Sequence, residues 1–179
     1  MKTFIALLRG INVGGQKRIP MAELCELLEK KGFKEVRTYI QSGNVIFNSS
    51  ETNEDALALK IQEAIKAHFR FEVPVLVILP SELKQIFNDC PFPQEKKEHS
   101  YFTFLFTNPD KNFVEKLTAT SYPNEEFLIT PNCIYFYCTI GYGKAKCSNN
   151  FFENKLKTTS TARNYKTVLK LLSLTSQIT

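Results

Sequence analysis

The order of apolar runs in the first 80 residues is the feature that most limits how this chain can fold. Short β-prone runs occupy residues 3–8, 36–40, 45–47 and 75–79. Helical apolar stripes occupy residues 20–31 and the segment that follows Asn53 as far as Phe69. The stripes recur at the three- to four-residue spacing of a helix, and the short runs are typical of strands. Pro20 suits the first position of a helix and Gly32 suits a helix end, so the predicted order is β-α-β-β-α-β.

That order defines a ferredoxin-like split βαβ unit, an antiparallel sheet with two helices on one face. The pattern of the second half predicts the order α-β-α-β-β-α-α. The middle of this order repeats the β-α-β-β part of the first half. We therefore expect an α+β protein, a ferredoxin-like β-α-β-β-α-β unit followed by a second, related α/β half. The predicted subdomains are residues 1–80 and residues 81–179, and the second ends in two helices, the last from about Ala162 to Leu172.

Composition excludes several classes of protein. The 43% apolar and 23% charged fractions are ordinary for a soluble domain, and no apolar run is long enough to span a bilayer. The apolar run at the N-terminus is too short for a signal peptide, which predicts a cytoplasmic protein without a membrane partner. The five cysteines and two histidines match no zinc or redox spacing, so we predict reduced thiols, no metal site and no cofactor.

The loop from Arg9 to Arg18 follows the first predicted strand and contains three glycines, three cations and no acid. Its Gly-x-x-x-Gly-Gly spacing fits neither a Rossmann fingerprint nor a P-loop. Two interpretations stay open. The cations Arg9, Lys17 and Arg18 contact an anion, or the loop needs Gly14 and Gly15 only for backbone turns with positive φ.

The segment Gln41-Ser42-Gly43-Asn44 is either a plain hairpin turn or a polar cluster near that loop. In a ferredoxin-like sheet we expect this turn and the loop at opposite ends. Ser42 as a nucleophile would need a general base, and no neighbouring residue supplies one.

A third polar segment, Thr158–Thr167, predicts a capped helix start with Arg163 in the first turn. A cation there opposes the helix dipole, so it is either compensated by a bound acidic group or simply exposed to solvent. Residues 144–170 contain seven cations against one acid, Glu153. Such a segment is either a phosphate-attracting surface or a solvated basic helix face.

Three of these stretches, Arg9-Gly-Ile-Asn-Val-Gly-Gly15, Thr38-Tyr-Ile-Gln-Ser-Gly-Asn44 and Thr161-Ala-Arg-Asn164, together resemble the uncharacterised, mostly bacterial family called domain of unknown function 1697. The resemblance covers nearly the whole chain. It implies a protein built around ferredoxin-like units and implies no activity. The chain differs from the family at Tyr165, where a tryptophan is expected more often.

The function predicted from these features is binding of an anionic or phosphate-bearing ligand, with nucleic acid as one candidate, through the basic loop and basic C-terminal helices. One alternative is a small-molecule enzyme with a polar cleft between the two halves. Another is an interaction protein or homodimer that uses the Phe-rich second half. The aromatic strand pattern of an RNA-recognition motif is absent. No catalytic residue is predicted. The candidate ligand-binding residues are Arg9, Asn12, Gly14, Gly15, Lys17, Arg18, Ser42, Gly43, Asn44, Arg163, Asn164 and Tyr165.

Overall fold

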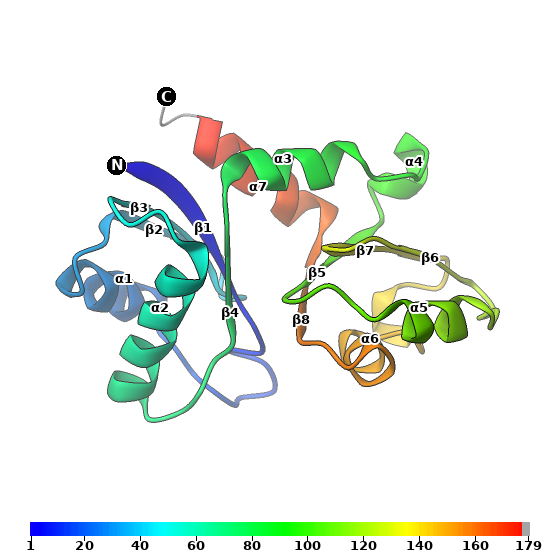
Figure 1. Cartoon of the computed structure of the whole chain (residues 1–179), viewed down its shortest axis with the longest axis horizontal. Helices are drawn as coiled ribbons and strands as arrows, with labels where there is room; N and C mark the ends of the chain where they lie inside the picture. Colours follow the sequence, from blue (N-terminus) through cyan, green and yellow to red (C-terminus); the bar gives the residue numbers. More distant parts are fainter. Residues whose placement is uncertain (177–179) are drawn as a thin grey trace. The chain divides into compact units, whose positions relative to one another are not determined.

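The computed structural model describes residues 1–176, which form two compact units (Figure 1). Among the described residues, the first unit contains Met1–Gln85 and Leu171–Ser176, and the second contains Ile86–Lys170. The boundaries fall within two helices, α3 (Pro80–Asn88) and α7 (Tyr165–Ser176). The second unit is thus inserted in sequence between two parts of the first.

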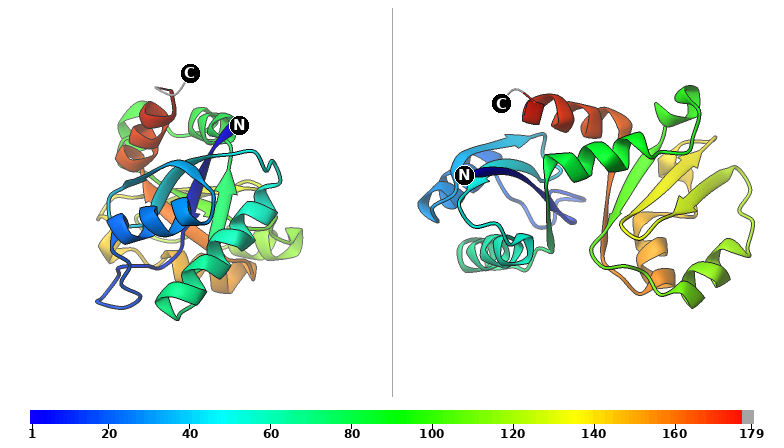
Figure 2. Two further views of the ribbon diagram at one scale, coloured as in Figure 1. Left: turned by 90° about the vertical axis from the view of Figure 1, so that its left-hand side faces the viewer. Right: turned by 45° about the horizontal axis from the view of Figure 1, so that its top comes forward.

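The N-terminal part of the first unit has the predicted β-α-β-β-α-β order, which the start of α3 follows. Its strands form a four-stranded antiparallel sheet in the order β2-β3-β1-β4. Helices α1 and α2 lie on the same face of that sheet (Figure 2), and their apolar stripes pack on alternate residues of the central strand β1, among them Phe4 and Leu8. The elements are β1 (Lys2–Leu8), α1 (Met21–Lys30), β2 (Lys34–Tyr39), β3 (Asn44–Ser49), α2 (Glu54–Phe69) and β4 (Val75–Ile78).

The ends of both helices follow from single residues. Pro20 precedes α1 in extended backbone, and Gly32, with a φ of 92°, follows its last turn. Asn53 caps α2, because its Oδ1 accepts a hydrogen bond of 2.9 Å from the backbone N–H of Ala56. The first half of the predicted fold is confirmed.

The second unit is itself a complete ferredoxin-like unit. Its strand order β6-β7-β5-β8 corresponds strand for strand to that of the first sheet. An aromatic core joins α5 and α6 to one face of the sheet, with Phe136 and Phe152 at its centre. The elements are α4 (Gln94–Lys97), β5 (Tyr101–Leu105), α5 (Lys111–Thr118), β6 (Glu125–Ile129), β7 (Cys133–Cys138), the 3₁₀ turn η1 (Tyr142–Lys144), α6 (Asn149–Leu156) and β8 (Ser160–Asn164). The predicted α+β class with a related second half is confirmed.

The prediction of a helix from about Ala162 is wrong over its first residues. Ser160–Asn164 forms strand β8, which pairs antiparallel with β5, and α7 begins only at Tyr165. Asn164 ends the strand and caps the helix, since its Oδ1 accepts a 2.9 Å hydrogen bond from the backbone N–H of Thr167. Serine and threonine suit helix caps, but threonine is also strand-prone, and the hydrogen bonds that β5 offers decide in favour of a strand.

Candidate functional site

Two of the three polar segments meet at one end of the first sheet. Leu7 of β1 pairs with Asn44 of β3, so the loop that leaves β1 lies beside the turn that enters β3. The backbone N–H of Leu8 donates to the Gly43 carbonyl over 2.8 Å. The expectation that the loop and the turn lie at opposite ends of the sheet is therefore wrong, because antiparallel neighbours bring the end of one strand to the start of the other.

The loop itself is a small hairpin, here called the basic hairpin (residues 9–18; the blue loop between β1 and α1 in Figure 1). The backbone N–H of Asn12 donates to the Lys17 carbonyl over 3.2 Å, and that of Gln16 donates to the Val13 carbonyl over 3.0 Å. Gly14 and Gly15 occupy the tip with φ values of 57° and 76°. Two consecutive residues with positive φ are what a two-residue hairpin turn of the primed type requires. The interpretation that these glycines serve the turn is confirmed.

Asn12 fixes the base of the basic hairpin. Its Nδ2 donates to the carbonyls of Gln41, over 2.8 Å, and of Ile19, over 3.1 Å. Its Oδ1 accepts from the backbone N–H of Ile19 over 2.9 Å. On the other side of the hairpin, the backbone N–H of Arg9 donates to the Pro74 carbonyl over 2.9 Å. The hairpin is thus anchored to both neighbouring loops, and its side chains project from a fixed frame.

The cations of the basic hairpin differ in exposure. Arg9 is half-buried, whereas Lys17 and Arg18 are exposed. The Lys17 Nζ donates to the Glu72 carbonyl over 2.8 Å. The carboxylate of Glu72 pairs with Lys66 at 2.6 Å, and this hydrogen bond lowers the pKa of Glu72. One Arg18 terminal nitrogen lies 3.8 Å from the point where a Gly15 Cβ would stand, so the guanidinium lies beside the hairpin tip.

The turn at residues 41–44 shows structural roles. Gly43 is buried with a φ of 81°, and a Cβ there would lie 2.6 Å from the Leu8 Cβ. Asn44 is fully buried, and its Nδ2 donates to the Tyr39 carbonyl over 2.9 Å and to the Ser42 Oγ over 3.0 Å. These contacts hold the turn against the end of β1.

The third segment lies in the second unit, and its arginine is not in a helix. Arg163 belongs to β8 and is only 5% exposed, with Nη1 donating to the Thr161 Oγ1 over 2.7 Å and to the Ala162 carbonyl over 2.8 Å. Burial lowers the pKa of Arg163 to about 10. The predicted conflict with a helix dipole does not arise, and a buried guanidinium adds nothing to an exposed basic helix face.

Tyr165, the first residue of α7, packs its ring against Phe87 with centroids 5.4 Å apart. Its hydroxyl accepts a 3.3 Å hydrogen bond from the Nε2 of Gln94. Tyr165 and the cap residue Asn164 therefore fix the start of α7 within the second unit.

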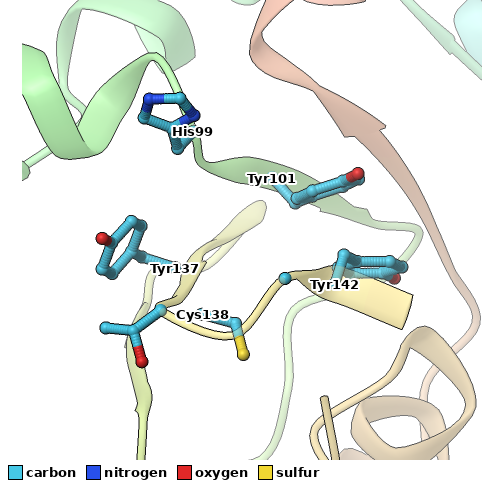
Figure 3. Close-up of a pocket in the computed structure, with 7 residues that line it drawn as sticks. His99, Tyr101, Tyr137, Cys138 and Tyr142 are labelled. Atoms are coloured by element: carbon cyan, nitrogen blue, oxygen red, sulfur yellow. The ribbon is translucent and has the colours of Figure 1, made fainter. Parts of the chain in front are cut away.

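The second unit also contains a cavity that the sequence analysis missed, here called the tyrosine pocket. It lies where β5 begins and β7 ends, and has a volume of about 430 Å³. Figure 3 shows His99 and the ring of Tyr137 on one side of the opening, with the rings of Tyr101 and Tyr142 on the other. The signal in the sequence is weak, because these residues are far apart and each one fits an ordinary strand or turn.

Among residues 1–176, no three His, Cys, Asp or Glu side chains are placed to hold one ion, and the five cysteines have free thiols. Within the same range, no helix combines the length and apolar character that crossing a bilayer requires.

Fold and geometry together define a protein of two successive ferredoxin-like units with a basic hairpin at the end of the first sheet. The chain belongs to the family described as protein of unknown function DUF1697, whose model matches residues 1–135. A conserved bacterial protein of Streptococcus pneumoniae has a similar solved structure, with a TM-score of 0.74, 22% identity, and coverage of 97% of this chain and 98% of that one. No protein with a curated description matches significantly. The similarity to the streptococcal structure concerns the fold alone.

Proposed function

We propose that the first unit binds an anionic, phosphate-bearing ligand at the basic hairpin. The observation that supports this most directly is the anchored frame. Asn12 ties the base of the hairpin to residues on both sides, and the hairpin carries the exposed cations Lys17 and Arg18. A preorganised loop loses little conformational entropy when a ligand binds, so more of the interaction energy appears as affinity.

The donors of the basic hairpin match a phosphate group. The guanidinium of Arg18 presents several N–H donors in a plane and pairs with two phosphate oxygens at once. The Glu72 carboxylate is the acidic group placed to compete for Lys17, and it is already paired with Lys66 at 2.6 Å. A multiply charged phosphate ester can therefore approach the two hairpin cations against little local repulsion.

The proposed phosphate-bearing ligand includes nucleic acid. The structure does not support binding in the way of RNA-recognition motifs, in which bases stack on aromatic side chains of the sheet. In that mode, aromatic side chains on the two central strands are open to bases on the face away from the helices. In the second sheet the corresponding aromatics, Phe102 and Tyr135, are 0% and 2% exposed. Contacts made to nucleic acid by Lys17 and Arg18 through the phosphates would be independent of sequence.

The test is a thermal-denaturation titration with pyrophosphate, ATP and a single-stranded oligonucleotide at low salt. A ligand present at ten times its dissociation constant stabilises the native state by about 1.4 kcal/mol. We expect Arg18→Gln to weaken binding roughly tenfold, the scale of one charged hydrogen bond. Lys31→Gln, an exposed cation just after α1, removes the same charge elsewhere in the first unit and should leave binding unchanged.

Three results distinguish a specific site at the hairpin, binding of nucleic acid and the absence of binding. Equal loss in Arg18→Gln and Lys31→Gln would mean general charge attraction and no site at the hairpin. Binding of the oligonucleotide with a steep salt dependence would identify nucleic acid, because counterions are released from the polymer. If none of the three probes raises the denaturation temperature, the proposal is wrong.

A further inference from the structure

We propose that the tyrosine pocket binds a planar heteroaromatic ring of the nucleobase class. This site lies within the second unit and does not depend on the basic hairpin. The argument rests on how its aromatic rings are arranged, on the charges around it, and on the polar groups at its rim.

The aromatic rings leave an opening between two walls. Tyr101 of β5 and Tyr142 of η1 stack on each other, with centroids 3.9 Å apart and planes inclined by 17°. Tyr137, at the end of β7, lies across the opening from this pair (Figure 3). All three rings are partly exposed. Because every nucleobase has a π-face, partly exposed aromatic rings provide a stacking surface for bases.

The charges around the pocket favour a neutral ligand. None of the described residues that line it is an Asp, Glu, Lys or Arg. Three aromatic rings around a space also resemble the cages that hold quaternary ammonium groups. Here, however, the Lys96 ammonium already lies 5.5 Å from the centroid of the Tyr137 ring, and Glu126 holds it there at 2.7 Å. The Tyr137 ring is therefore already engaged by a cation, and the uncharged lining suits a neutral ring better than a second cation.

Polar groups at the rim supply hydrogen-bonding partners for the edge of a base. The His99 imidazole is exposed at the upper side of the opening (Figure 3), and it can donate from one ring nitrogen while it accepts at the other. Thr139 also lines the pocket, and its hydroxyl can both donate and accept a hydrogen bond. The volume of about 430 Å³ falls in the range of small-ligand sites and exceeds what a single methylammonium group fills.

The chain supplies its own reporter and control for the test. His99 lines the pocket, and the other histidine of the sequence, His68, belongs to α2 of the first unit. The imidazole proton signals of both are followed by NMR at constant pH while adenosine or uridine is added. We expect the His99 signals to shift saturably and those of His68 to stay in place. Inorganic phosphate, which has no ring, should move neither by stacking.

Variants of the pocket tyrosines then test whether their rings bind the nucleoside that shifts the His99 signals. Tyr137→Leu removes one wall and should weaken nucleoside binding roughly tenfold, since stacking on one aromatic ring contributes on that scale. Tyr39→Leu makes the same change at a half-buried strand tyrosine of the first unit and should leave binding unchanged. Tyr142→Leu exposes a single ring in place of the stacked pair and should also weaken it, so the proposal does not depend on one variant folding.

The proposal is overturned by any of three results. The first is a His99 shift that does not saturate with either nucleoside. The second is nucleoside binding by Tyr137→Leu that equals that of the wild type. The third is a larger His99 shift with tetramethylammonium than with adenosine. The last result would show a cation cage in place of a base site. Because the probes carry no phosphate, failure here leaves the proposal for the basic hairpin untouched.

Discussion

Replacing Gly43 with alanine tests how the first two polar segments are held together. The new Cβ would lie 2.6 Å from the Leu8 Cβ, an atom attached directly to the backbone, and 2.9 Å from the terminal methyl carbon Cδ1 of the buried Ile11. Both neighbours are buried, at 0% and 1% exposure, so relief requires the backbone to move. Overpacking of this kind costs about 1–3 kcal/mol. The φ of 81° adds about 1–2 kcal/mol for any residue with a side chain.

The control is Gly14→Ala at the tip of the basic hairpin. Its φ is also positive, at 57°, but no atom lies within 4 Å of the new Cβ. Only the backbone cost of about 1–2 kcal/mol applies there. Gly43→Ala should therefore lose about 1–3 kcal/mol more stability than Gly14→Ala, the difference being the clash alone.

The assay is urea denaturation followed by the NMR signal of His68, which reports on the first unit, with that of His99 reporting on the second. We expect the midpoint for His68 to fall in both variants, with an unchanged m-value, and to fall further in Gly43→Ala. If the two variants agree within about 0.5 kcal/mol, the close approach of Gly43 to Leu8 does not constrain the turn and the reasoning fails.

Three further changes test the second unit. The buried Oγ1 of Thr103 has no hydrogen-bond partner among the described residues. Thr103→Val should therefore stabilise the protein by about 1 kcal/mol in urea denaturation. A loss of stability would show that the hydroxyl has a hydrogen-bond partner. The Tyr135 hydroxyl donates a 2.8 Å hydrogen bond to the Ile86 carbonyl in the last turn of α3. Tyr135→Phe should lower the free energy of unfolding by about 1–3 kcal/mol, because that carbonyl is left without its partner. An unchanged urea midpoint would contradict this. Burial tends to raise the pKa of Glu125, but hydrogen bonds from the Cys147 thiol and from two backbone N–H groups outweigh it, so its pKa lies below the usual 4.5. Its stabilising contribution is therefore present above that pH and is lost as the pH falls through the lower, native value. Stability measured by denaturation between pH 6 and about pH 3 should decline less steeply in Glu125→Gln, and identical profiles would refute the assignment.

The first unit could be predicted from sequence because each of its elements carries its own signal. Asn53 and Gly32 mark helix ends, and apolar periodicity separates helices from strands. Strand β8 lacked such a signal. Ser160-Thr-Ala-Arg-Asn164 has no apolar run, and its extended backbone depends on hydrogen bonds from β5, which is distant in sequence. Long-range pairing of this kind is decided by tertiary structure rather than by local propensity.

The candidate site also has a part that the sequence could predict and parts that it could not. The turn formed by Gly14 and Gly15 was predictable, because only local backbone geometry is involved. The contact between Asn12 and Gln41 depends on which end of β1 lies beside the start of β3, and from the sequence we expected the loop and the turn at opposite ends of the sheet. The tyrosine pocket was out of reach, since Tyr101, Tyr137 and Tyr142 come together only through the pairing of β5 with β7 and the turn that follows it.

The insertion of the second unit within the first sets an order of events during synthesis. The first unit includes Leu171–Ser176, and the 85 residues from Ile86 to Lys170 must be translated before that segment is made. At ordinary elongation rates this interval lasts roughly 4–17 s. The sheet of the first unit is therefore synthesised early but waits for its last segment, while the second unit emerges with all of its residues in one stretch. A nascent chain of this protein should thus complete its second unit before its first.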